Sequence, residues 1–555
     1  MVLLSSEEFF PRQYFSGGDV IVSEKSAGSW VNKLLGFFNS TSNFRIIFML
    51  VLMFDVRYLA ETAYNIVLSL MGLWALLLMT HRLIVKKCIF RVRYRYIIYL
   101  FLACACIPVI LHSEMNLMAN IVTLFWMTMC FFLFYGSHAE KSNCRLKKEM
   151  RLCFDVINFV TTLIMFVSLV LFAIFPKGFM LMGFEFCIIE SRFVGVIPNA
   201  NVTAFYSVIS IVFCTFLLRM RRADGTVNIK YRIWYITCIV INSFTLILTD
   251  SNASLLFMMV YISFWFFYEL FKEFTLKKLY TIILRLAAAF LACVTVVASL
   301  FFVRVGVQKT ISYMLDARFS QIAVSTTLDA NNGDMVLEEP EPEASSGETK
   351  KEEKPEEKIS LGHENKNIDS GRYTLWRQAL RMIERNPVFG IGKDNIPDYG
   401  KMYIGGKGIR YTRIGDHQYV NFHNGLLTIA VSYGIVGLSL FLVFAVTVAK
   451  AVLKSMFKYK TKSRRDGNVL VLIASFSAAY CVYSMFEVAL FVDYTYRVFV
   501  FWLVIGLGMS YLFKYRRQDA YSHGIDVNAH DDNSELLYLR KKIMGLKKLK
   551  ENKYG

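Results

Sequence analysis

Charged residues are scarce in this chain of 555 residues, where Asp, Glu, Lys and Arg together make up 19%. Hydrophobic residues make up 55% and aromatic residues 15%. A soluble protein of this length needs a far more polar surface, so the composition excludes an ordinary soluble domain. The chain has long uncharged runs instead, and about 20 such residues in a helix cross a hydrocarbon core of ~30 Å.

These runs predict an all-α integral membrane protein with about twelve transmembrane helices. Their approximate bounds are 44–60, 62–85, 95–112, 116–136, 154–175, 199–218, 231–249, 253–271, 281–303, 424–449, 468–486 and 495–514. The predicted organisation is a cytoplasmic segment at 1–43 with an interfacial helix at 25–38, helices 1–9 at 44–303, a loop at 304–422, helices 10–12 at 423–514 and a basic tail at 515–555.

Acidic residues are fewer than basic ones, at 43 against 62, which gives a net charge of +19. The basic residues gather in connections such as 86–95, 218–222 and 458–465, which follow even-numbered spans. The connections on the other side hold few. Because Lys and Arg favour cytoplasmic loops, this bias predicts a multi-pass protein of the cytoplasmic (inner) membrane with both termini inside. The same distribution of charge argues against a nucleic-acid partner. We expect the basic tail to contact anionic membrane lipids instead.

Cysteine is missing from the long loop at 304–422, although the chain has eleven. No disulfide framework can therefore hold this loop. There is also no paired CxxC motif, no His/Cys cluster at zinc spacing and no DxD pair in the outward segments. We accordingly expect neither a metal site nor a cofactor.

The long extracytoplasmic loop lies between predicted helices 9 and 10, and its two halves differ. Residues 316–369 carry fourteen acids against six bases, a composition that predicts disorder. Residues 370–422 are basic, and we expect them to be helical and functional. A helix at 371–385 would place Tyr373, Trp376, Leu380 and Ile383 on one apolar face directed towards the membrane or the bundle. Asn386-Pro387 would end it.

Three stretches carry a resemblance to a known family. GRYTLWRQALRMIERNPVFGIGKDN (371–395), followed by HNGLLTIAVSYGIVGL (423–438), resembles the O-antigen ligase and polymerase family. The shared pattern is Gly-Arg, a Trp four residues later, an Asn-Pro and Gly-x-Gly stop, and then His-Asn at the start of a Gly-rich span. RFVGVIPNAN (192–201) is similar to the Arg-x-x-Gly and Asn-x-Asn that the family carries before a spanning helix.

The resemblance implies a membrane glycosyltransferase with an architecture like that of the GT-C enzymes. The donor would be a glycan on undecaprenyl pyrophosphate, and the acceptor a sugar hydroxyl on a glycan or glycolipid at the outer face of the membrane. The reaction would invert the anomeric configuration and need no metal. Whether it polymerises repeat units or ligates finished chains stays open.

The resemblance also assigns roles to single residues. His423 would be the catalytic base, since an imidazole exchanges protons near neutral pH. Arg372 and Arg192 would bind the pyrophosphate, with Arg410 or Arg413 as further candidates. Four other residues would contact substrate: Asn199, Asn201, Trp376 and Asn424. For Trp376 an interfacial anchor is the alternative, and for Asn199 and Asn201 it is the opening of a helix.

One position departs from the family pattern. Members carry Ser-Arg after a Thr at the outer end of a middle span, but this chain reads LTDSNASLL (248–256), with Asn252 where Arg is expected. A phosphate-binding cation is therefore missing or comes from elsewhere in the chain. Asp55, Glu487 and Asp493 lie in or beside spans, where charge is costly and often functional, but the sequence assigns them no partners.

A flippase or transporter for lipid-linked oligosaccharide is the alternative function, because carriers often have twelve spans with both termini inside. Carriers also tend to contain internal repeats and interrupted helices. The first half of this chain has no evident duplicate in the second. A large basic outer loop that ends in His-Asn has no obvious use in a carrier, so the glycosyltransferase is favoured.

Overall fold

The computed structural model describes residues 29–54, 57–85, 92–136, 143–181, 184–189, 192–197, 199–271, 279–331, 372–404, 412–414, 417–419, 422–458, 464–490 and 494–522. Its helices are α2 (Ser29–Phe38), α3 (Thr41–Met53), α4 (Arg57–Ile84), α5 (Arg95–Leu111), α6 (Leu117–Met129), the π-helix η3 (Cys130–Tyr135), α7 (Asn143–Ile174), α8 (Ala200–Ala223), α9 (Ile229–Leu248), α10 (Asn252–Phe271), α11 (Leu279–Asn331), α12 (Arg372–Arg385), α13 (Ile396–Ile404), α14 (Gly425–Lys458), α15 (Arg464–Tyr483) and α16 (Tyr496–Ser522).

Membrane-length helices dominate the described part of the chain. Eight are long and apolar enough to cross a membrane, or nine if the bent pair α2 and α3 forms one span. Three shorter apolar helices, at Arg95–Leu111, Val469–Tyr483 and Tyr496–Leu512, coincide with three further predicted runs. The structure confirms a helical membrane protein, whereas the count of about twelve stays a prediction.

Boundaries differ from the predicted ones in two places. Helix α3 ends at Met53 and α4 begins at Arg57, so the first two runs meet several residues earlier than predicted. Helix α11 continues to Asn331, and the start of the segment predicted to be disordered is therefore helical. Residues 332–369 of that segment lie outside the described residues, as does the tail beyond Ser522.

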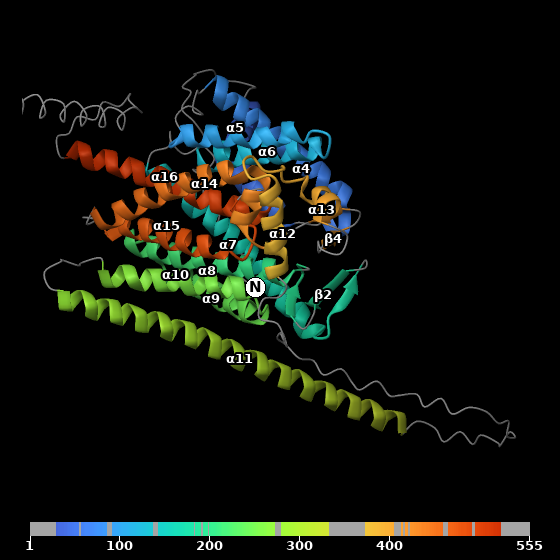
Figure 1. Cartoon of the computed structure of the whole chain (residues 1–555). Coiled ribbons are helices and arrows are strands. Elements are labelled where there is room, and N and C mark those ends of the chain that lie inside the picture. Colours follow the sequence, from blue (N-terminus) through green and yellow to red (C-terminus); the bar gives the residue numbers. More distant parts are fainter. Residues whose placement is uncertain are drawn as a thin grey trace, which may run out of the picture.

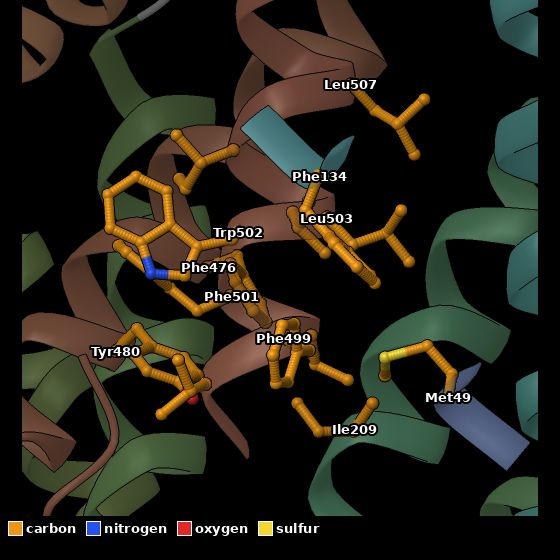
Figure 2. Close-up of a cluster of buried hydrophobic side chains, with 14 of the residues drawn as sticks. Met49, Phe134, Ile209, Phe476, Tyr480, Phe499, Phe501, Trp502, Leu503 and Leu507 are labelled. Carbon is orange, nitrogen blue, oxygen red and sulfur yellow. The ribbon is translucent and has the colours of Figure 1, made fainter. Parts of the chain in front are cut away.

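The helices form one bundle, with α11 along its edge (Figure 1). Helix α8 is central, packing on α7, α9, α10 and α15, while α10 also packs on α11 and α15. The core is rich in aromatic residues, whose rings pack on one another edge-to-face or tilted. Trp502, Phe499, Phe134 and Tyr480 meet there from three different elements (Figure 2).

Two small sheets lie at the end of the bundle that also carries α12 and α13, to the right in Figure 1. Strands β1 (Phe179–Leu181), β2 (Phe184–Ile189) and β3 (Arg192–Gly195) form an antiparallel sheet in that order. Strands β4 (Thr412–Ile414) and β5 (His417–Tyr419) form a hairpin. The all-α prediction missed these strands, which belong to short connections without a helical apolar period.

Helix α14 is broken at Gly434, whose backbone is not helical. The segment after α12 fills the break: Ile391 and Gly392 donate backbone hydrogen bonds to the carbonyls of Val431 and Ser432 at 3.0 and 2.9 Å. Beyond the break, the amides of residues 435 and 436 donate to the carbonyls of residues 387 and 388. Backbone groups freed inside a membrane protein need partners, and the segment after α12 supplies them. We call residues 387–392 the clamp segment.

Candidate active site

His423 lies directly before α14, with its backbone in the left-handed region at φ 49°. The side-chain oxygen of Asn424 accepts hydrogen bonds from the amides of Leu426 and Leu427, both at 3.0 Å, and so caps the helix. The indole of Trp376 on α12 donates to the carbonyl of Phe422 at 3.0 Å. Two neighbours of His423 are thus held by a cap and by α12, and these contacts fix where the imidazole sits.

Glu487 is the acidic partner of this histidine. It lies in the connection between α15 and α16, and only 2% of it is exposed. His423 Nδ1 is 3.5 Å from Glu487 Oε1. The amide of Gly425 donates to the carbonyl of Ser484 at 2.7 Å, which ties the start of α14 to the same connection.

Arginines surround the Glu487 carboxylate. Arg497 Nη1 lies 3.0 Å from Oε2, and Arg372 Nη2 lies 3.8 Å from Oε1. Burial alone would raise the pKa of Glu487, but the contact with His423 and the charges of Arg497 and Arg372 outweigh it and lower the pKa to about 2. The carboxylate therefore stays ionised at neutral pH.

Asn201 extends the site to a third arginine. Its amide nitrogen donates to Glu487 Oε1 at 3.1 Å, and its oxygen accepts from Arg192 Nη2 at 2.8 Å and from Ser251 Oγ at 3.0 Å. Arg192 also donates from Nε to the carbonyl of Thr249 at 3.0 Å. Asn199, by contrast, is exposed and accepts from the amides at the start of α8, so it caps that helix.

A fourth arginine lies at the corner between α9 and α10. Arg304 of α11 forms an ion pair with Asp250 and donates from Nη1 to Asn252 Oδ1 at 2.7 Å. Gln308, one turn later, donates to the same carboxylate at 3.3 Å. The position where the family pattern expects an arginine is thus in contact with an arginine from another helix.

The structure brings together five of the nine residues named from the sequence, namely His423, Arg372, Arg192, Asn201 and Trp376. Asn199 and Asn424 lie beside them as helix caps. Arg410 lies outside the described residues, and of Arg413 the structure describes only the backbone, which belongs to β4. Trp376 makes the anchoring contact described above.

The buried face of α12 differs from the prediction. Leu375, Ala379 and Met382 are buried, whereas Tyr373 and Leu380 are 60% and 50% exposed. The predicted and the buried sets of residues both recur at helical spacing. The buried set, which contains the small Ala379, packs on α14. Trp376 and Ile383 of the predicted face pack against the same buried cluster, so the predicted face meets the bundle in part, and a membrane contact of Tyr373 and Leu380 stays a prediction.

Fold and site together define a class: a multi-pass membrane protein whose histidine, buried carboxylate and four arginines meet at one end of the bundle. Residues 237–442 match the family model described as O-antigen ligase. The match includes the motifs at 371–395 and 423–438, confirms the resemblance to this family and supports a membrane glycan ligase or polymerase, whereas the motif at 192–201 lies outside it. It covers His423, Arg372 and Arg304, whereas Arg192 and Glu487 lie outside it. A search among curated proteins found no match.

Proposed function

We propose that the protein transfers a glycan from undecaprenyl pyrophosphate to the hydroxyl of an acceptor sugar, on a glycan or glycolipid, at the outer face of the cytoplasmic membrane. The observation that carries this proposal is the contact of His423 with the buried, ionised Glu487 inside a ring of arginines. Both a polysaccharide polymerase and an O-antigen-type ligase perform this chemistry, and they differ only in the acceptor.

The histidine is suited to take the acceptor proton. A carboxylate only accepts hydrogen bonds, so its contact with Nδ1 favours a hydrogen on that atom and leaves Nε2 as the base. As the acceptor oxygen bonds to the anomeric carbon, its proton passes to Nε2. Glu487 then stabilises the imidazolium, as the carboxylate does in other nucleophile–histidine–carboxylate arrangements.

The arginines are suited to the leaving group. The bond between the anomeric carbon and the pyrophosphate oxygen breaks as the new bond forms, and negative charge grows on the phosphate. Guanidinium groups pair with phosphate oxygens through several N–H donors. Arg372 and Arg192 would bind this group without a metal ion, and a single displacement inverts the anomeric configuration.

The test compares wild type with His423→Ala at matched membrane levels. We expect transfer to fall by about 10²–10⁴-fold, the usual contribution of a general base, with lipid-linked precursor accumulating on the outer leaflet. Unchanged product would remove His423 from the mechanism. Precursor trapped on the inner leaflet would favour a flippase instead. Offering the purified protein either precursor alone or precursor with a separate glycolipid acceptor distinguishes polymerase from ligase.

A further inference from the structure

The corner between α9 and α10 gathers two arginines from separate elements. Arg192 of β3 reaches the carbonyl of Thr249, and Arg304 of α11 reaches the side chains of Asp250 and Asn252. Arg304 is paired with the carboxylate of Asp250, whereas Arg192 also contacts the side chain of Asn201. Because like charges repel, a further anion bound at this corner would be stabilised by both arginines.

Arg304 stands at a costly place for a cation. The preceding residues, Phe301, Phe302 and Val303, are 53%, 73% and 50% exposed on a helix that crosses the membrane. An arginine in such a span usually lines a polar pathway or a binding site. Helix α11 packs on α9 and α10 at the edge of the bundle, so Arg304 is the arginine of the site that comes from this lipid-facing helix (Figure 1).

Charge in the network favours a dianion. Among the described residues, Arg304 pairs with Asp250, and Arg372 and Arg497 lie beside Glu487, while Arg192 is hydrogen-bonded to Asn201. With neutral histidine this leaves an excess of two positive charges. A lipid diphosphate ester carries about two negative charges near neutral pH, and guanidinium groups recognise its oxygens through paired N–H donors.

We propose that Arg304 binds the diphosphate of the lipid-linked donor on the membrane-facing side of the site. A guanidinium has five N–H donors, so Arg304 can hold Asp250 and a phosphate oxygen together. The side chain takes the role of a cation at position 252, where this chain has Asn. The inference rests on the proposed function for the identity of the donor, but the binding it describes can be measured without transfer.

The probe is undecaprenyl pyrophosphate, which carries no sugar, and the protein is the full chain in vesicles of zwitterionic phospholipid. Arg304→Gln should weaken probe binding by about tenfold or more, the usual effect of losing a charged hydrogen bond. Arg304→Lys should retain part of the affinity. Arg285→Gln is the matched control, because Arg285 lies on α11 but contacts the carbonyl of Leu270 at the other end of the helix.

A second substitution separates binding from a structural role. Asn252 Oδ1 is 2.7 Å from Arg304 Nη1, so Asn252→Arg places a guanidinium at the same corner. In the Arg304→Gln background it should restore affinity to within a few-fold of wild type. Arg304→Gln binding as tightly as wild type overturns the proposal. So does a loss that Asn252→Arg leaves unchanged, since Arg304 would then act only through Asp250.

Two further results distinguish the role of Arg304 from binding of membrane headgroups and from the proposed transfer reaction. An Arg304 effect that appears only when the vesicles contain anionic phospholipid would assign the residue to membrane headgroups and overturn the inference. A wild-type protein that binds the probe in an Arg304-dependent way, yet transfers no glycan from any lipid-linked donor, would defeat the proposed function and leave this inference standing.

Discussion

Glu487 links the charges at the centre of the site, because its buried carboxylate contacts His423, Arg372, Arg497 and Asn201. Removing the negative charge leaves Arg497, with 12% of its side chain exposed, without that countercharge. We therefore expect Glu487→Gln to destabilise the fold by a few kcal/mol at neutral pH and to lower transfer at least tenfold.

The pH dependence of this effect has a fixed sign. The folded pKa of Glu487, about 2, lies below the ordinary value of 4.5. The stabilisation is therefore complete above pH 4.5 and is lost as the pH falls from there towards 2. The difference in Tm between wild type and Glu487→Gln should shrink over this window in thermal melts. Glu384→Gln, on the exposed face of α12, is the control. A difference that stays constant would contradict the assigned charge state.

Residues that lie in short motifs could be predicted from the sequence, whereas residues that reach the site only through folding could not. His423 and Arg372 follow from short patterns with fixed spacing. Glu487 stood out as a charge beside a span, but its histidine lies 64 positions earlier along the chain and only folding brings them together. Arg304 was hidden because it is the first residue after the predicted run 281–303, where a boundary cation is unremarkable.

At the scale of elements, the broken helix α14 and the clamp segment hold the start of that helix against α12. Gly434 has φ 67°, and a Cβ there would lie 2.1 Å from the carbonyl oxygen of Val388. Residue 434 must therefore be glycine, both for its backbone and for the close approach. The apolar run predicted an unbroken helix at 424–449. A hydrophobic pattern cannot show that the backbone of a single glycine leaves the helical conformation where another segment packs against it.

Gly434→Ala should release the clamp segment and lower both stability and transfer. The backbone at φ 67° and ψ −172° is essentially confined to glycine and costs another residue about 1–3 kcal/mol, and the contact with Val388 adds to it. Gly72→Ala on α4 is the matched control, because its Cβ would meet only ordinary contacts at 3.6 Å. Thermal unfolding in detergent and transfer assays measure the two effects. Equal melting temperatures for the two variants would mean that the clamp contributes nothing to the fold.

At the scale of the whole molecule, composition predicted the helical membrane fold, because a membrane imposes long apolar helices, whereas the side that the charge bias assigns to each basic loop stays a prediction. The small sheets and the packing of α12 were not predicted, because these segments carry no long apolar run. The side on which the site opens is a prediction of the charge bias, and every step of the proposed function depends on it.

Cysteine labelling tests that orientation. Glu384 on α12 and Lys454 near the end of α14 are both exposed and lie on opposite sides in the predicted topology. In right-side-out vesicles, a membrane-impermeant maleimide should label Glu384→Cys at once and Lys454→Cys only after permeabilisation. The wild-type chain, labelled in parallel, gives the background of the native cysteines. The reverse pattern would place the arginine site in the cytoplasm, where a transferase acting on the outer leaflet could not reach its donor.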